Sequence, residues 1–151
     1  MNIRFLRLSF NNAAEDVRVV PVDYKLYSVG FHWDNNREVR CSGEYCTYCK
    51  EGAFIHTRIM IPLYSESERC IKYWPRSNFS IQYIDNLYNR CDGHPERYTF
   101  KLIRHGHKFD KFTTYEFVNL GEANPNVVIP EVATPEEVFS YLFAPVEEET
   151  A

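Results

Sequence analysis

The hydrophobic and polar residues of this chain alternate in short runs that are typical of β-strands. Residues 3–10 (IRFLRLSF) alternate imperfectly, and residues 17–33 (VRVVPVDYKLYSVGFHW) are rich in β-branched and aromatic side chains, so both segments are predicted to be strands. Pro21 indicates an edge strand or a bulge, because proline has no N–H to donate to a neighbouring strand. The Asp-Asn-Asn sequence at 34–36 predicts a turn or loop.

Four further strands are predicted after residue 52. Residues 53–64 (AFIHTRIMIPLY) alternate well enough for one strand, and residues 69–75 (RCIKYWP) form a short apolar run that ends at a proline. Residues 97–120 (RYTFKLIRHGHKFDKFTTYEFVNL) predict two strands that are connected around residues 106–110.

One helix is predicted between the second and third of these strands. Ser77 can cap its first turn, and Ile81, Ile84 and Tyr88 recur at the spacing of one helical face. Gly93 is expected to end it.

A second helix is predicted near the C-terminus. Thr134 is a suitable N-cap, Pro135 suits the first helical position, and Glu137 completes a capping box. Its apolar face would consist of Val138, Phe139, Leu142 and Phe143.

Five or six short strands interrupted by one helix fit a small twisted barrel or a partly open sheet. They do not fit a stack of βαβ units, because the helices are too few for the crossovers that parallel strands need. We therefore expect a mainly β fold with one or two short helices. The five-stranded Greek-key barrel called the OB-fold is the leading candidate.

Length and composition are those of one intracellular globular domain. The chain has 151 residues, of which 44% are hydrophobic and 16% aromatic, and this length can bury a core without disulfide bonds. No apolar run approaches the ~18 residues of a membrane span, and the N-terminus lacks the features of a secretory signal. We expect a soluble cytoplasmic protein that does not bind membranes.

The net charge of −4 is distributed unevenly along the chain. Residues 1–125 hold all 17 Lys and Arg and 15 of the acidic residues, a net charge of +2, whereas residues 126–151 hold six Glu and no basic residue. We therefore divide the chain into a domain at 1–125 and an acidic C-terminal tail at 126–151 that contains the second helix.

Three of the five cysteines lie within nine residues, in the segment 41–52 (CSGEYCTYCKEG). Clustered cysteines in a reducing compartment indicate a metal site or redox chemistry more often than a disulfide. The Cys46-x2-Cys49 pair can offer two thiolates from one tight turn, and Cys41 can supply a third through the flexible loop that contains Gly43. Buried inert thiols, a disulfide and a catalytic cysteine are weaker alternatives, so a structural zinc ion is predicted.

The sequence offers several candidates for the fourth ligand of this zinc ion. His32 is the nearest upstream nitrogen and gives the spacing H-x8-C-x4-C-x2-C. A regular hairpin that turns at 34–36 would separate His32 from Cys41 by about three rungs, or ~10 Å, so an irregular return is expected. Cys70, Cys91 and His94 remain alternative fourth ligands.

Basic and aromatic residues are interleaved in two segments, 72–76 (KYWPR) and 97–117. This pattern is typical of proteins that bind single-stranded nucleic acid, because the cations contact the phosphates and the rings stack on the bases. The same alternation also arises when one face of a strand packs in the core, so each ring is also a candidate for burial. The candidate nucleic-acid-binding residues are Arg58, Lys72, Tyr73, Trp74, Arg76, Arg104, Lys108, Phe109, Lys111 and Tyr115.

Residues 25–118 resemble small phage-type single-stranded-DNA-binding proteins in which a zinc knuckle is inserted into an OB-like barrel. The resemblance is carried by the His, Cys, C-x2-C order in 32–49 and by an R-x-G…T-x-Y-x-V pattern, here Arg104, Gly106, Thr113 or Thr114, Tyr115 and nearby Val118. It implies binding of exposed DNA strands in replication or recombination, in a phage-infected host, with the acidic tail contacting partner proteins. This acidic tail differs from the tails of those single-stranded-DNA-binding proteins, because it does not end with an aromatic residue.

A protein-interaction role is the alternative function. A zinc-braced adaptor or inhibitor would use the acidic residues to meet a basic partner or to mimic nucleic acid. An enzyme is not expected, because the sequence shows no phosphate-binding glycine loop, deaminase motif or carboxylate cluster.

Overall fold

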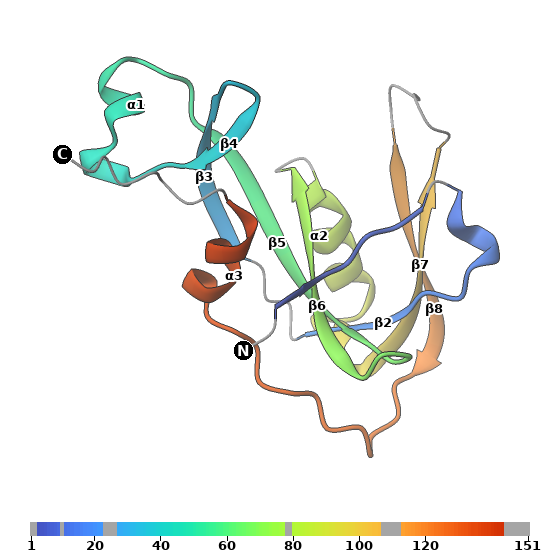
Figure 1. The fold of residues 1–151 in the computed structure, drawn as a ribbon. Helices are drawn as coiled ribbons and strands as arrows, with labels where there is room; N and C mark the ends of the chain where they lie inside the picture. The colour runs from blue at the N-terminus through green and yellow to red at the C-terminus, as the bar shows by residue number, and fades with distance from the viewer. Residues whose placement is uncertain (1–2, 10, 23–26, 78–79, 107–112, 144–151) are drawn as a thin grey trace.

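The structure is a computed structural model that describes residues 3–9, 11–22, 27–77, 80–106 and 113–143 (Figure 1). Within these residues the chain forms an eight-stranded open sheet and three short α-helices. The expected mainly β class is confirmed, and the arrangement is consistent with an OB-like fold. None of the described helices has the length and apolar character needed to span a membrane.

The sheet has the strand order β1-β6-β5-β2-β7-β8, and β3, paired with β4, joins it along β5. The strands are β1 (Arg4–Phe5), β2 (Arg18–Pro21), β3 (Tyr27–Asp34), β4 (Arg37–Arg40), β5 (His56–Ser65), β6 (Cys70–Ser77), β7 (Tyr98–His105) and β8 (Thr114–Glu122). Neighbouring strands are antiparallel except for β1, which runs parallel to β6.

The long strand β5 connects the two parts of the sheet. One edge of β5 pairs with β6, from Arg58 to Ser65. Its other edge pairs first with β3, at residues 56–60, and then with β2, at residues 63–65. The β3–β4 hairpin therefore extends from one end of β5, and the β2–β7–β8 strands from the other (Figure 1).

The turn predicted at 34–36 is the two-residue connection of the β3–β4 hairpin. Asn35 and Asn36 both have positive φ, 49° and 64°, and Asp34 pairs with Arg37. Two consecutive left-handed residues match the right-handed twist of the flanking strands, and asparagine tolerates this conformation better than most residues.

Pro21 lies neither on an edge strand nor in a bulge, so that expectation was wrong. It is the last residue of β2, which lies between β5 and β7. The pairing of β2 with β7 includes Arg18 and Val19 only, whereas pairing with β5 continues to Pro21. A proline is tolerated here because the ladder to β7 has already ended.

The helix predicted after residue 77 begins later than expected. Ser77 is the last residue of β6, and α2 spans Ile81–Arg90 with Ser80 at the N-cap. Ile84 and Leu87 are its buried residues, one turn apart. Gly93, at φ 79°, follows its C-terminal end in a left-handed conformation, which glycine adopts without strain.

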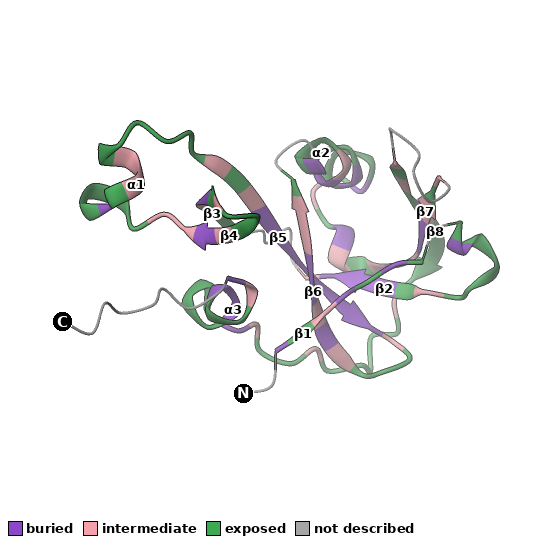
Figure 2. Cartoon of the chain, turned by 45° about the horizontal axis from the view of Figure 1, so that its top comes forward, coloured by how far each residue is buried: buried purple, intermediate pink, exposed green. Residues whose placement is uncertain are grey.

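Two hydrophobic clusters lie on the two faces of the sheet. Alternate residues of β5 supply both: Ile59 and Ile61 belong to the cluster that includes α2, and Met60 and Tyr64 to the cluster that includes α3. Figure 2 shows the buried residues concentrated in β2, β5 and β6, between the two helices. The alternation along one strand thus builds both sides of the core.

The predicted C-terminal helix forms as α3 (Pro135–Leu142) and packs on the body of the chain. The Thr134 hydroxyl accepts a hydrogen bond from the Glu137 N–H at 3.3 Å, as a capping box requires. Of its predicted apolar face, Val138, Phe139 and Phe143 are buried and Leu142 is half-buried. The tail helix thereby completes the second cluster.

Candidate metal centre and cationic pocket

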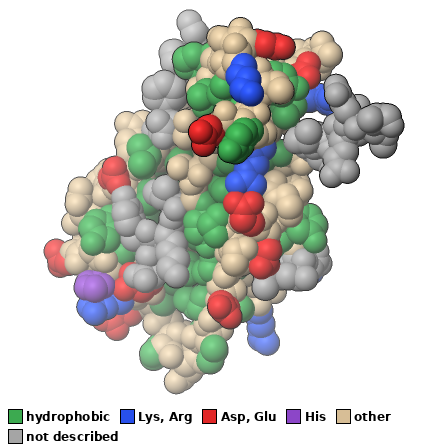
Figure 3. All heavy atoms as spheres, turned by 90° about the vertical axis from the view of Figure 1, so that its left-hand side faces the viewer, with side chains coloured by type: hydrophobic (Ala, Val, Ile, Leu, Met, Phe, Trp, Pro, Cys, Tyr) green, Lys and Arg blue, Asp and Glu red, His purple; other side chains and the backbone are tan. Residues whose placement is uncertain are grey.

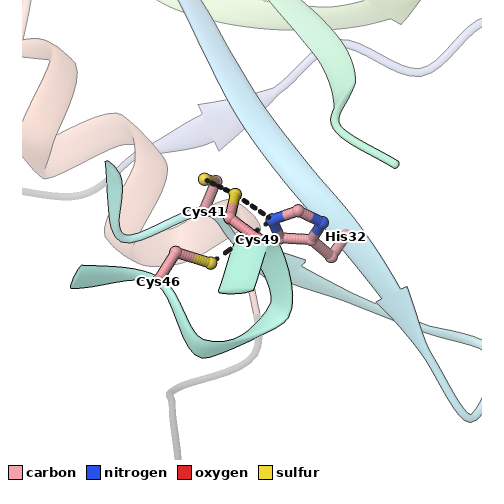
Figure 4. A group of neighbouring side chains, drawn as sticks. All are labelled: His32, Cys41, Cys46 and Cys49. Carbon is pink, nitrogen blue, oxygen red and sulfur yellow. Dashed lines mark hydrogen bonds between the residues drawn. The ribbon is translucent and has the colours of Figure 1, made fainter. Parts of the chain in front are cut away.

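Four predicted ligands converge at one end of the sheet (Figure 4). His32 projects from β3, Cys41 directly follows β4, and Cys46 and Cys49 belong to the short helix α1 (Thr47–Lys50) and its N-cap. The ligand nitrogen and the sulfur atoms all lie within 4.8 Å of one another. In the part of the chain that the structure describes, these four residues form a group that could hold a metal ion.

The register of the β3–β4 hairpin explains how His32 reaches Cys41. With a two-residue turn, Phe31 pairs with Arg40, and the Cys41 N–H donates to the Gly30 carbonyl at 2.9 Å. Cys41 therefore lies opposite Gly30, two residues from His32 and on the same face, a diagonal spacing of about 7 Å. The expected three-rung separation was wrong, because a two-residue turn brings Cys41 one rung closer, and no irregular return is needed.

Gly30 provides the space in which this approach occurs. A Cβ at Gly30 would lie 3.0 Å from the Cγ2 of Ile55 and 3.5 Å from the Cβ of Cys41. A larger side chain would therefore push against Cys41 and against the start of β5. The glycine keeps the two backbones close enough for the cysteine to face the histidine.

The Cys46-x2-Cys49 turn is held by local backbone hydrogen bonds. The Cys46 N–H donates to the Gly43 carbonyl at 3.1 Å, and the Lys50 N–H donates to the Cys46 carbonyl at 3.2 Å. Gly43 has a φ of 71°, which allows the chain to reverse before α1. This turn presents both thiols to the same point.

The histidine has one defined tautomer. Its Nδ1 lies 2.9 Å from the Phe54 carbonyl oxygen, which can only accept, so Nδ1 carries the proton. The Nε2 lone pair then faces Cys46 Sγ at 3.3 Å and Cys49 Sγ at 3.5 Å. A histidine oriented in this way by a backbone carbonyl is typical of metal ligands.

The imidazole of His32 is 0% exposed and is covered by the ring of Tyr48. The two rings stack with centroids 5.3 Å apart, and the Tyr48 hydroxyl donates to Asp34 at 2.6 Å. This hydrogen bond is the largest cause of a raised pKa of Tyr48. The stack excludes water from one side of the ligand group.

The three thiols influence one another strongly. Burial raises the pKa of Cys46, but backbone N–H groups of Cys49 and Ser42 and the neighbouring thiols outweigh it and lower the pKa to about 6. Burial and the nearby Cys41 and Cys46 raise the pKa of Cys49 to about 11. Of Cys46 and Cys49, only Cys46 forms a thiolate readily, so a cation would be needed to stabilise both as thiolates.

Three of the six ligand-to-ligand distances are close to those of a tetrahedral zinc site, and all six are within 4.8 Å. Four N and S ligands at about 2.0–2.3 Å from zinc are about 3.5–3.8 Å apart. The observed separations are 3.3 Å and 3.5 Å from Nε2 to sulfur and 3.6 Å between the sulfurs of Cys41 and Cys49.

The alternative ligands have other surroundings. Cys91 is buried in the cluster that includes α2, and His94 Nδ1 lies 3.0 Å from Glu96. The Cys70 sulfur lies 4.0 Å from an Arg4 nitrogen.

Four of the predicted nucleic-acid-binding residues line one pocket of about 340 Å³. They come from three strands: Trp74 and Arg76 from β6, Arg104 from β7 and Tyr115 from β8. The pocket is also lined by Arg7 and by residues that follow β1, and it has no carboxylate in its lining. We call it the cationic pocket.

Two of the predicted stacking rings are buried, and their assignment as stacking rings was wrong. Tyr73 is 3% and Trp74 1% exposed, because the alternation of β6 directs one into each hydrophobic cluster. Tyr73 also accepts a hydrogen bond from the Ala133 N–H at 2.8 Å, which anchors the segment before α3. Neither ring face is available to a base in the folded protein.

The remaining candidates are dispersed. Arg58 forms a salt bridge with Glu38, and Lys72 with Glu68, so both charges already have carboxylate partners. Lys108, Phe109 and Lys111 lie outside the described residues.

The sequence predictions did not include three exposed rings beside the candidate metal centre: Trp33, Tyr45 and Phe54. These rings belong to no recognised sequence motif. The signal that could have identified them is their position in the sequence, next to the predicted ligands.

No protein-family model, curated protein or solved structure matches this chain. The chain's own residues therefore carry the functional inference.

Proposed function

We propose that this chain is a single-stranded-DNA-binding protein that acts in replication or recombination and is stabilised by a structural zinc ion. The cationic pocket is the observation that carries the proposal. It gathers three arginines, Arg7, Arg76 and Arg104, and no acidic residue. The phosphate backbone is the ligand that such a site suits, and it supplies most sequence-independent affinity.

The position of Arg76 supports an anionic ligand. Its guanidinium lies 5.2 Å from the Trp74 ring centroid and 5.1 Å from that of Tyr115, and it donates to the Tyr115 hydroxyl. Burial lowers the pKa of Arg76, Tyr115 opposes this, and the charges of Arg104 and Arg58 lower it further. Like charges held this close repel one another, and a bound phosphate would relieve the repulsion.

Zinc has a structural role in this proposal. His32, Cys41, Cys46 and Cys49 would fill all four positions of a tetrahedron and leave none for a substrate. The ion would hold β3, β4 and α1 together, and its binding free energy would add to that of folding.

A salt titration with a labelled single-stranded oligonucleotide tests the function. The logarithm of the binding constant should fall with the logarithm of salt concentration with a slope of about −0.7 per phosphate neutralised. Arg7→Gln changes an exposed side chain of the pocket and should weaken binding and reduce the slope. Arg97→Gln is the control, because Arg97 is exposed and belongs to a different pocket. Absence of binding at low ionic strength would refute the proposal.

The adaptor hypothesis is favoured by one observation, a second pocket of about 490 Å³ with Glu66, Glu96 and Glu122 in its lining. These carboxylates would suit a basic partner.

Removing residues 144–151 distinguishes the DNA-binding function from the adaptor function. This segment includes Glu147, Glu148 and Glu149 but no residue of α3. A DNA-binding protein should bind oligonucleotide more tightly after this loss of negative charge, whereas an adaptor that uses this segment should lose partner binding.

A further inference from the structure

An exposed group of rings lies beside the candidate metal centre, at the end of the sheet where β3 meets β5. Trp33 is 52% and Phe54 74% exposed, and both contact His56, with ring centroids 6.4 Å and 4.8 Å away. We call Trp33, Phe54 and His56 the aromatic surface. Figure 3 views this side of the molecule and shows hydrophobic side chains at the surface, interspersed with charged ones.

The aromatic surface is fixed in place from below. Phe31 is buried and packs edge-on against Trp33 at 5.7 Å and in a stack against His56 at 5.3 Å. The backbone carbonyl of Phe54 accepts the hydrogen bond from His32 that orients the candidate metal ligand. The rings are therefore preorganised, and little side-chain entropy would be lost when a ligand binds.

Neither hydrophobic cluster includes Trp33 or Phe54. Trp33 and Phe54 are joined through His56, and contiguous exposed apolar side chains mark interaction sites on protein surfaces. Flat, accessible rings suit nucleobases, because every base has a π-face that can stack without sequence preference.

Arg58 lies between the aromatic surface and the cationic pocket, and its charge also pairs with Glu38. The Arg58 guanidinium lies 5.0 Å from the centroid of Phe31, the ring that supports the aromatic surface. Ile59, the next residue of β5, pairs with Arg76 of the cationic pocket, so Arg58 is one position from the partner of Arg76. A chain with regularly spaced phosphates and bases could therefore meet cations and rings in succession, which a neutral apolar peptide would not exploit.

We propose that the aromatic surface is a second contact area for single-stranded DNA, in which bases stack on Trp33 and Phe54 while phosphates occupy the cationic pocket. The inference rests on the proposed function and adds to it the residues that receive the bases. It replaces the buried Trp74 and Tyr73 as stacking residues.

Fluorescence provides the first test, because Trp33 and Trp74 are the two tryptophans of the chain. In the full-length Trp74→Phe variant, a single-stranded oligonucleotide should quench the emission of the remaining, exposed Trp33. In Trp33→Phe, the emission of Trp74 should be quenched less, because this ring is buried and bases cannot stack on it, although it lies beneath Arg76 in the cationic pocket. Quenching in Trp33→Phe but not in Trp74→Phe would overturn the proposal.

Affinity provides the second test, by anisotropy of a labelled oligonucleotide. Trp33→Leu and Phe54→Leu keep an apolar side chain but remove the flat ring, and each should weaken binding by about 5- to 100-fold. The salt slope should not change, because no phosphate contact is lost. Leu120→Ala is the control, since Leu120 is another exposed apolar residue, on β8. Zinc content and thermal unfolding, measured on each variant, separate loss of stacking from loss of fold.

The outcomes distinguish this inference from the proposed function. If the unmodified chain binds the oligonucleotide and both leucine variants bind equally well, the aromatic surface is not a DNA contact, although the proposed function stands. If the unmodified chain does not bind at low salt, the proposed function itself fails. Leucine variants that lose a protein partner but keep oligonucleotide affinity would assign the aromatic surface to the adaptor hypothesis instead.

Discussion

The Nε2 atom of His32 lies 3.3 Å from the Sγ atom of Cys46, although the two residues are 14 positions apart in the sequence. Because Nδ1 of the same ring is hydrogen-bonded to the Phe54 carbonyl, the Nε2 lone pair faces the sulfur. The nitrogen lone pair and the sulfur would repel each other at this distance unless a proton or a metal cation lay between the two atoms. Cys41 and Cys49 complete a group whose spacing suits a tetrahedral metal ion.

Replacing one sulfur should remove the ion. Cys46→Ser is expected to lower bound zinc, measured by elemental analysis, from about one ion per chain to well below one. At free zinc near 1,000 times its Kd, the loss should decrease the free energy of unfolding by about 4 kcal/mol. Cys70→Ser is the matched control, because Cys70 lies outside the ligand group, and it should keep the zinc. Equal zinc content in both variants would contradict the assignment.

Zinc binding should release protons. Burial and neighbouring thiols raise the pKa of Cys49 to about 11, so its thiol is protonated at pH 7 in the metal-free protein and must lose that proton to bind. The apparent zinc affinity should therefore fall as the pH decreases. Calorimetric titrations in two buffers that differ in ionisation enthalpy measure the protons released per zinc, and a value of zero would contradict the prediction.

The two tryptophans should differ sharply in their effect on stability. Trp74→Ala removes a ring that is 1% exposed and packs edge-on against Tyr115 and Phe117, so it should destabilise the fold by about 3–5 kcal/mol. Trp33→Ala changes a ring that is half exposed and should cost less than about 1.5 kcal/mol. Urea denaturation of both variants tests the difference, and equal midpoints would show that Trp74 is not a core residue.

The salt bridge between Arg40 and Glu136 should make the contribution of α3 depend on pH. Both guanidinium Nη atoms lie 2.8 Å from the Glu136 carboxylate, and this contact lowers the pKa of Glu136 below its usual 4.5. A lowered pKa in the folded state stabilises the protein above pH 4.5, and the contribution disappears as the pH falls through the folded pKa.

The variant Glu136→Gln should therefore melt at a lower temperature than the unmodified protein at pH 7. At pH values below the pKa of Glu136 in the folded protein, its carboxyl group is protonated and neutral, as is the glutamine side chain of the variant. The variant and the unmodified protein should then melt at the same temperature. Glu137→Gln is a control in the same helical turn. A difference between Glu136→Gln and the unmodified protein that persists unchanged at pH 3 would contradict the prediction.

Features that depend on neighbouring residues could be predicted from the sequence alone. The two asparagines at 35 and 36, the cap residue Thr134 and the apolar residues of 53–64 each favour a local backbone conformation. The structure confirms a turn at the asparagines, the hydrogen bond from the Glu137 N–H to the Thr134 hydroxyl, and a strand at His56–Ser65. The C-x2-C spacing also belongs to this class, because a single turn can present both sulfurs. The sequence thus determined the mainly β class and the set of candidate metal ligands.

Only the tertiary structure decided which side of each strand became core. Because side chains alternate along a strand, Trp74 and Arg76 share one face of β6, but the sequence does not determine whether that face is exposed to solvent. The packing of α2 and β8 against this face buries Trp74. The meeting of Arg76 with Arg104 and Tyr115 depends on how the sheet curves, because β5 and β2 separate β6 from β7 and β8 in the strand order. These two residues lie 28 and 39 positions after Arg76 in the sequence. Side-chain burial is a collective property of elements distant in the sequence, so a local pattern can name the candidates but cannot choose among them.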